Sequence, residues 1–142
     1  MFNNLFSAAS ISATGMSAER MRMETVAHNI ANANSTHSVD GGAYRRKQLV
    51  FSSLVNRNAD GSSSLAGVEV IGQEADSSEL PKIHIPDHPD ADENGYVEMP
   101  NVKLPNEMVD LITASRSYEA NLKALTSFKE MIEQTLMLLR VS

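Results

Sequence analysis

The C-terminal flank of the chain, residues 106–142, reads NEMVDLITASRSYEANLKALTSFKEMIEQTLMLLRVS. Ten positions in this stretch follow one another at alternating steps of three and four residues, and eight of the ten are apolar. Such a seven-residue repeat is typical of a helix that packs in a coiled coil. The eight apolar positions are the predicted packing seam, with Ser115 and Lys129 as its polar members: Met108, Leu111, Tyr118, Leu122, Leu125, Ile132, Leu136 and Leu139.

The beginning of this helix is predicted at Asn106, directly after Pro105. Asn is a favoured N-cap residue, and the acidic residues Glu107 and Asp110 suit the positive end of the helix macrodipole. A helix over residues 107–140 is roughly 50 Å long at 1.5 Å per residue. That length exceeds the width of a small domain.

The N-terminal flank, residues 1–34, predicts a second long helix. Many small residues around Gly15 permit close approach of another helix, and its Ser, Asn and Gly content lowers its intrinsic helix propensity. We therefore expect this helix to need a partner in order to fold. The residues predicted to pack it against that partner are Phe2, Leu5, Ala9, Met16, Met23, Val26 and Ile30.

The middle of the chain, residues 35–105, holds all five Pro and six of the seven Gly residues. Because Gly and Pro break helices, this segment predicts short strands and turns. Apolar residues favour strands within 44–55 and at 68–71, joined as a hairpin with a long connection, and an extended segment around 83–85.

The predicted fold is mainly α with a small β-rich middle. Long N- and C-terminal helices pair as a coiled-coil-like arm, and a short β-hairpin or extended module lies between them. The expected divisions of the chain are an N-terminal helical arm (1–34), a middle module (35–105) and a C-terminal heptad helix (106–142).

The composition excludes several classes of protein. The 142 residues contain 12 Lys+Arg and 18 Asp+Glu, a formal net charge of −6, and no Cys, which excludes disulfide scaffolds and Cys-ligated zinc modules. The acidic balance disfavours a nucleic-acid partner. The one basic cluster, Arg45-Arg46-Lys47, is expected on a solvated face or at a subunit contact.

The chain also lacks the features of membrane insertion and of cleaved secretion signals. A stretch of about 18 apolar residues, as a spanning helix needs, does not occur in the sequence. The N-terminus lacks the basic and apolar regions of a signal peptide. We expect no direct membrane insertion.

A metal-like pattern lies at residues 90–95, DADENG. Asp90, Asp92 and Asn94 match the first positions of an EF-hand loop, but Asn101 stands where the bidentate Glu is required. A solvated acidic loop is the favoured interpretation, and a calcium-responsive binding module stays the alternative. Pro86 separates His84 from His88 and excludes the regular helix that would align them on zinc. The sequence predicts no metal site, catalytic residue, cofactor or small-molecule substrate.

Several motifs in order resemble the bacterial flagellar axial proteins of the rod and hook family. They are VAHNIANANST at 26–36, GGAYRRKQ at 41–48, HPDA at 88–91, GYV at 95–97, PNV at 100–102, EMV at 107–109 and ASRSYEAN at 114–121. The resemblance spans essentially the whole chain and is strongest to a proximal-rod component. The residues that carry the family signature are Asn29, Ile30, Ala31, Asn32, Asn34, Tyr44, Arg45 and Arg46.

The resemblance implies a structural subunit and no enzymatic activity. Both terminal helices would lie together in an inner tube, with the middle segment facing outward and the C-terminal seam at contacts between subunits. The implied partners are other rod subunits, further copies of the chain and the flagellar type III export apparatus. The implied location is the periplasm-spanning rod of the basal body, reached from the cytoplasm without a cleaved signal peptide.

Overall fold

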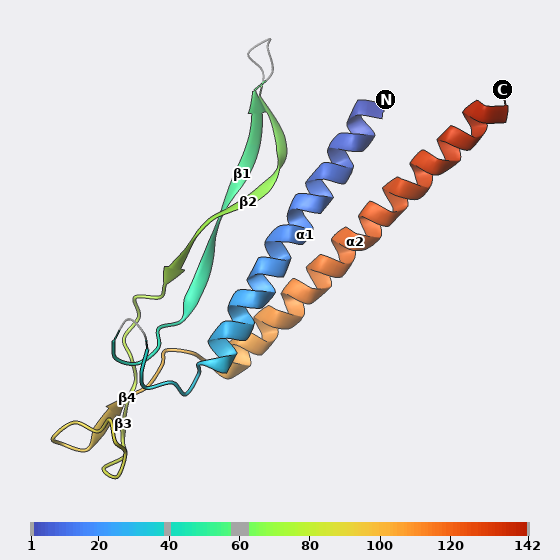
Figure 1. The fold of residues 1–142 in the computed structure, drawn as a ribbon. Coiled ribbons are helices and arrows are strands. Elements are labelled where there is room, and N and C mark those ends of the chain that lie inside the picture. The colour runs from blue at the N-terminus through green and yellow to red at the C-terminus, as the bar shows by residue number, and fades with distance from the viewer. Residues whose placement is uncertain (1, 39–40, 58–62, 142) are drawn as a thin grey trace. The chain divides into compact units, whose positions relative to one another are not determined.

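The computed structural model describes the backbone of residues 2–38, 41–57 and 63–141, and the side chains of residues 6–38, 41–56 and 63–138. Two long helices are the first and last elements of the chain, and the four strands between them in the sequence form two small sheets (Figure 1). In chain order the elements are α1 (Phe2–Ala31), β1 (Lys47–Arg57), β2 (Ser63–Ala75), β3 (Lys82–His84), β4 (Tyr96–Glu98) and α2 (Leu104–Val141). The predicted fold class, with long terminal helices around a small β-rich middle, is confirmed.

Helix α1 ends within the Asn-rich stretch of residues 29–34. The backbone N–H and the Nδ2 atom of Asn32 both donate to the carbonyl oxygen of His28, over 3.2 and 2.8 Å. The first is the regular helical bond, and the second adds a side-chain donor to the same carbonyl group in the last turn. Asn32 therefore lies directly after the last helical residue, Ala31, and contacts the end of α1.

The predicted beginning of the C-terminal helix was wrong by two residues. Helix α2 begins at Leu104, and the carbonyl oxygen of Lys103 accepts from the backbone N–H groups of Asn106 and Glu107. Pro105 thus lies inside the first turn, where its missing N–H costs no intrahelical bond and its fixed φ suits the helix. The helix has 38 residues, about 57 Å at 1.5 Å per residue.

The strands form two separate two-stranded sheets. Strands β1 and β2 run in opposite directions in Figure 1 and confirm the predicted hairpin, with 11 and 13 residues respectively. The extended segment around Ile83 is β3, and it pairs antiparallel with β4 in the register Lys82↔Glu98, Ile83↔Val97 and His84↔Tyr96. The sequence analysis did not predict β4.

The packing of the chain divides it into two compact units. Unit 1 comprises residues 1–21, 51–71 and 113–142, and unit 2 comprises residues 22–50 and 72–112. Unit 1 has six basic and six acidic residues, whereas unit 2 has six basic and twelve acidic residues. The whole net charge of the chain therefore belongs to unit 2.

The two units differ in how much they bury. In unit 1, Ala18 and Ala114 are the buried residues among those described. Unit 2 buries larger and more polar side chains: Thr25, Val26, Asn29, Ala43, Tyr44, Val97 and Glu107. Unit 1 thus has almost no core of its own within a single chain.

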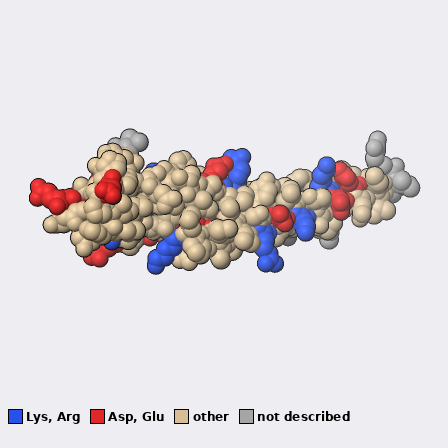
Figure 2. All heavy atoms as spheres, turned by 90° about the horizontal axis from the view of Figure 1, so that it is seen from below, with Lys and Arg blue, Asp and Glu red and all other residues tan. Residues whose placement is uncertain are grey.

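Charged side chains are scattered among uncharged ones on the face shown in Figure 2. Large apolar side chains are exposed on the helices and on the β1–β2 sheet, with Leu138, Leu65 and Met137 exposed by 75, 70 and 66 %. Within the described part of the chain, no helix is long and apolar enough to span a bilayer.

Candidate functional site

A buried hydrogen-bonded junction lies in unit 2 around Asn29, which is fully buried. Its Nδ2 atom donates to the carbonyl oxygen of Lys47 over 2.8 Å and to Oε2 of Glu107 over 2.9 Å. Its Oδ1 atom accepts from the backbone N–H of Lys47 and from the hydroxyl of Tyr44, both over 2.9 Å. The side-chain amide therefore uses its full hydrogen-bonding capacity. It joins the end of α1, the beginning of β1 and the beginning of α2.

The second centre of this junction is the buried carboxylate of Glu107. Arg46 donates to it from Nε over 2.6 Å and reaches Oδ2 of Asp110 from a terminal nitrogen over 3.3 Å. Arg22 approaches the other oxygen of Asp110 at 4.0 Å. A buried carboxylate needs a paired charge and hydrogen bonds to offset its desolvation, and Glu107 has both.

Two pKa values in the junction depart from their ordinary positions. Burial raises the pKa of the Tyr44 hydroxyl, and the negative charge of Glu107 raises it further. For Arg46, burial acts to lower the pKa, but the hydrogen bond and charge of Glu107, with the charge of Asp110, leave it raised. Arg46 is therefore a permanent cation within the junction.

The structure places the predicted signature residues in different roles. Asn29, Tyr44 and Arg46 meet in the junction, and Asn32 contacts the end of α1. Ile30 is half-buried, and Ala31 and Asn34 are exposed. Arg45 donates to the carbonyl oxygens of Asp76 and Ser78, over 3.4 and 3.1 Å.

The expectation that the basic cluster lies on a solvated face or at a subunit contact was wrong for Arg46. Its guanidinium group pairs with two carboxylates of the same chain, which lie 61 and 64 residues away. The sequence analysis also missed the central position of Glu107, which it assigned only to the helix macrodipole. An acidic residue in the first turn of a helix can interact with the helix macrodipole or form a buried ion pair. The sequence carried no signal to separate these two roles.

A second close contact lies in unit 1, at Thr14 and Gly15 of α1. The Thr14 hydroxyl donates to the carbonyl oxygen of Ile11 over 2.7 Å and accepts from the backbone N–H of Val68 in β2 over 3.3 Å. A Cβ at Gly15 would lie 2.9 Å from Nδ2 of Asn121 in α2. One turn of α1 therefore contacts β2 through Thr14 and α2 through Gly15.

The predicted packing residues of α1 are buried to different degrees. Val26 is buried, and Ala9, Met16, Met23 and Ile30 are half-buried. The side chains of Phe2 and Leu5 lie outside the described ones. Packing of α1 against other chains therefore stays a prediction for this set.

The predicted seam of α2 is only partly covered within the chain. Met108, Leu122 and Leu136 are exposed, and Leu111, Tyr118, Leu125 and Ile132 are half-buried. The side chain of Leu139 lies outside the described ones. Contacts of this seam between subunits stay a prediction.

The carboxylates of the acidic loop accept hydrogen bonds from the loop and from the segment after α1. Oδ1 of Asp92 accepts from the backbone N–H groups of Asn94 and Tyr96, both over 2.9 Å. Oδ2 of Asp90 accepts from the hydroxyl of Thr36 over 2.7 Å. The hydrogen bond from the Thr36 hydroxyl lowers the pKa of the Asp90 carboxyl, and the hydrogen bonds from the backbone N–H groups of Tyr96 and Asn94 lower the pKa of the Asp92 carboxyl. Among the described residues, no group of three or more His, Cys, Asp or Glu side chains could hold a metal ion.

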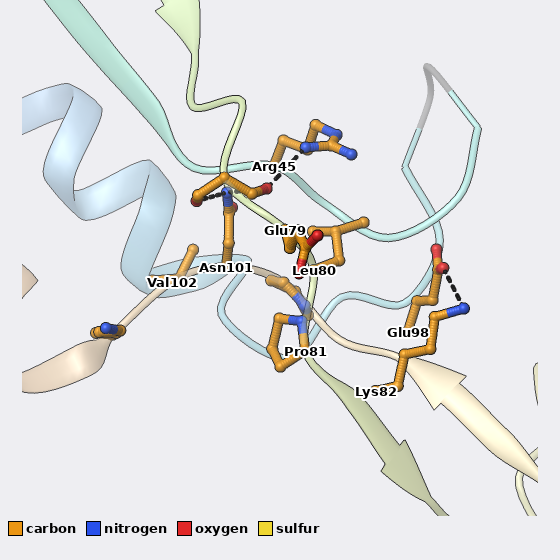
Figure 3. Close-up of a pocket in the computed structure, with 11 residues that line it drawn as sticks. Arg45, Glu79, Leu80, Pro81, Lys82, Glu98, Asn101 and Val102 are labelled. Carbon is orange, nitrogen blue, oxygen red and sulfur yellow. Dashed lines mark hydrogen bonds and ion pairs between the residues drawn. The ribbon is translucent and has the colours of Figure 1, made fainter.

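A cleft of about 850 Å³ opens in unit 2 beside the base of the β3–β4 sheet (Figure 3). Leu80, Pro81, Pro100 and Val102 supply its apolar lining, and charged side chains stand around it. Nδ2 of Asn101 donates to the hydroxyl oxygen of Ser78 over 2.8 Å. Together with the Arg45 hydrogen bonds, this contact fixes the connection between β2 and β3.

Two family models match the segments that build the junction. Residues 10–37, which include Asn29, match the model described as "Flagella basal body rod protein". Residues 93–138, which include Glu107 and Asp110, match "Flagellar basal body rod FlgEFG protein C-terminal". These matches define the class of the chain as the flagellar basal-body rod proteins.

Full-length relatives narrow the class. The chain is 39 % identical to the flagellar basal-body rod protein FlgC of Borreliella burgdorferi, over 96 % of this chain and 98 % of the relative. It is 47 % identical to FlgC of Aquifex aeolicus, over 93 % of this chain and 95 % of the relative. It is 38 % identical to FlgC of Bacillus subtilis, over 92 % of this chain and 95 % of the relative. The chain belongs to the FlgC family of flagellar basal-body rod proteins. The resemblance found in the sequence is thereby confirmed.

Proposed function

We propose that the chain is a structural subunit of the flagellar basal-body rod, in its proximal part, with no catalytic role. The observation that carries this proposal is the exposure of large apolar side chains along both long helices. Phe6 and Ile11 of α1 and Met108, Ile112 and Met137 of α2 are each exposed by 41 % or more. The exposure of several large apolar side chains on each helix is what contacts with other subunits would cover.

Assembly supplies the packing that a single chain lacks. Unit 1 carries no net charge, so copies and other subunits can pack against it without charge repulsion. Each apolar Leu or Ile side chain that a contact removes from water contributes about 1.5–3 kcal/mol. Contacts between different faces of neighbouring subunits generate a helical filament when the rotation between subunits does not close a ring, as the proposed rod requires.

The neighbours in this proposal are other rod subunits and further copies of the chain, in the rod that crosses the periplasm. Export through the flagellar type III apparatus, without a cleaved signal peptide, completes the proposal and rests on family membership. The calcium-responsive alternative gains no support from the contacts of Asp90 and Asp92. We do not propose it.

The substitution Leu122→Asp tests the proposal in the source bacterium. Leu122 is 43 % exposed in the single chain, so the change costs the isolated chain little, whereas it places a charge in the predicted seam of α2. We expect loss of rod assembly and of motility. The matched control is Ser127→Asp, which adds the same charge at an exposed position of α2 outside the seam. Normal rods and motility with Leu122→Asp would contradict the proposal.

A further inference from the structure

The acidic loop ends in the pair Asn94–Gly95, the one place in the sequence where Gly follows Asn. In such a pair the backbone nitrogen of the Gly can attack the side-chain amide of the Asn, because the Gly has no Cβ to obstruct the approach. Asn94 is exposed, so water reaches its amide. The pair therefore has the composition and the access that spontaneous deamidation requires.

The fold itself requires Gly at position 95. Its φ of +77° is a left-handed backbone conformation that other residues rarely adopt. A Cβ on this residue would lie 3.1 Å from Nε2 of His84 and 3.3 Å from Cα of Pro86. The turn thus requires the very residue that makes Asn94 reactive, and a larger residue cannot take its place to shield the amide.

Asp92 binds the backbone on both sides of this pair. Its Oδ1 atom accepts from the N–H groups of Asn94 and Tyr96, both over 2.9 Å. Its carbonyl oxygen accepts from the N–H of Gly95 over 2.9 Å, and its own N–H donates to the carbonyl oxygen of Tyr96 over 2.8 Å. Three consecutive N–H groups, including that of the attacking nitrogen, therefore donate to one residue.

Deamidation requires the Gly95 nitrogen to leave this arrangement. The nitrogen forms a bond to Cγ of Asn94, the bond from Cγ to Nδ2 breaks, and the proton of the Gly95 nitrogen passes through water to Nδ2, which leaves as ammonia. The resulting five-membered imide adds water and opens to Asp or to isoaspartate. While the Gly95 N–H donates to Asp92, its proton is not available to water, and rotation of the amide toward Cγ breaks that hydrogen bond.

We propose that Asn94 is a site of spontaneous deamidation and that the hydrogen bonds to Asp92 suppress the reaction in the folded chain. Local opening of residues 92–96 is the step that permits it, so the rate of deamidation follows the fraction of time that this turn is open. The inference concerns a single chain and does not depend on the proposed function.

Isoaspartate at position 94 would disturb β4. It lengthens the backbone by one carbon atom directly before the strand. The carbonyl oxygen of Gly95 accepts from the N–H of Ile85 over 2.8 Å, next to the His84↔Tyr96 pair of the register. Val97, the next residue of β4, is only 1 % exposed. The modification would therefore displace β4 along β3 and weaken the packing of Val97.

Peptide mapping of the purified full chain tests the proposal. Trypsin releases residues 83–103 as one peptide, and mass spectrometry follows the conversion of the Asn94 amide to a carboxyl group in mildly alkaline buffer. We expect conversion to be at least about tenfold faster in denaturant than in the folded chain, because the hydrogen bonds to Asp92 are then absent. Asn101, in the same peptide and followed by Val102, is the internal control that should stay unmodified. Equal rates at Asn94 in both conditions, or no conversion in either, would overturn the proposal.

Substitutions at Asp92 test the suppression in the folded chain. Asp92→Ala removes the Oδ1 acceptor of two N–H groups, and conversion at Asn94 should rise at least about tenfold. Asp92→Asn keeps an oxygen acceptor and should convert more slowly than Asp92→Ala. Asp87→Ala removes an exposed carboxylate of the same connection and should leave the natural rate unchanged. Equal rates in Asp92→Ala and Asp87→Ala would overturn the role of Asp92. Should Asp92→Ala fail to fold, the comparison of the folded and the denatured natural chain still decides the proposal.

Thermal unfolding of the modified chain tests the effect on β4. Asn94→Asp adds the same charge as deamidation without the additional backbone atom, so it should unfold at the same temperature as the natural chain. Chain enriched in isoaspartate at position 94 by incubation in denaturant, and then refolded, should unfold at a lower temperature. Equal unfolding temperatures of the refolded chain and of Asn94→Asp would contradict the displacement of β4.

Discussion

Nδ2 of Asn29 donates a hydrogen bond of 2.9 Å to Oε2 of Glu107, across 78 residues of sequence. Both side chains are fully buried, and each comes from a different long helix. The bond joins the two family segments, so the beginning of α2 is fixed against the end of α1 in unit 2. Within this junction the Asn29 amide and the Glu107 carboxylate find their partners in the same chain.

Loss of the Asn29 amide should destabilise unit 2. Asn29→Ala removes a hydrogen-bond partner of the Tyr44 hydroxyl, of both backbone groups of Lys47 and of Oε2 of Glu107. Each buried group that stays unsatisfied destabilises the folded chain by about 1–3 kcal/mol. We expect a loss of at least about 3 kcal/mol in the free energy of unfolding, measured by urea titration. Asn34→Ala, at an exposed position, is the control and should change stability by less than about 0.5 kcal/mol. Equal stability of both variants would refute the role of Asn29.

The charge of Glu107 should matter more than that of Asp110. Glu107→Gln leaves the Arg46 guanidinium beside a neutral amide in a buried site, and breaking a buried pair costs about 3–5 kcal/mol. Asp110→Asn alters a partly exposed pair, for which about 1 kcal/mol or less is expected. Thermal unfolding of the two variants side by side measures the difference. A larger loss in Asp110→Asn would contradict the assigned centre of the junction.

Gly67 should be required for the contact between β2 and α1 in unit 1. Its φ of +138° disfavours any other residue, and a Cβ there would overlap the hydroxyl of Thr14. We expect Gly67→Ala to break the Thr14–Val68 hydrogen bond and to increase proteolysis of β2. Gly72→Ala is the matched control, because a Cβ at that position meets no atom within 4 Å. Unchanged proteolysis in Gly67→Ala would show that β2 does not depend on this contact.

Stability should fall in alkaline solution through Tyr44. Burial, with the charge of Glu107, raises the Tyr44 pKa above its ordinary value of 10.0 in the folded chain. Above about pH 10 the unfolded chain has lost a proton that the folded chain retains, so the free energy of unfolding decreases as pH rises. Ultraviolet titration of the three tyrosines should show one that ionises last, and Tyr44→Phe should remove it. Ionisation of all three tyrosine hydroxyls at the same pH would contradict the burial of Tyr44.

The sequence was sufficient to predict features that depend on local composition. The seven-residue repeat predicted the C-terminal helix, and the concentration of Gly and Pro in residues 35–105 predicted where the helices stop and the strands begin. Helix α1 ends at Ala31, close to the end of the flank at residue 34 that the sequence predicted to be helical. Only the first turn of α2 differed, because Pro105 is tolerated inside a first turn as well as before it.

The partners in the junction could not be predicted from the sequence. Asn29, Arg46 and Glu107 lie in three segments with no periodic relation, and each residue has an ordinary local explanation as a helix end, a surface cation or a helix-dipole anion. Strand β4 has three residues, Tyr96–Glu98, too few to show an alternating pattern. Only the register with β3 reveals it.

Hydrogen exchange tests most directly the central claim that neighbouring subunits supply the packing absent from unit 1. In the isolated chain, we predict fast exchange of the amides at residues 122–138 of α2 and slow exchange around Asn29 and Glu107, because unit 1 buries little and unit 2 holds the junction. In purified rods, the amides at residues 122–138 should become strongly protected. Equal protection of residues 122–138 in the isolated chain and in the rod would contradict the account.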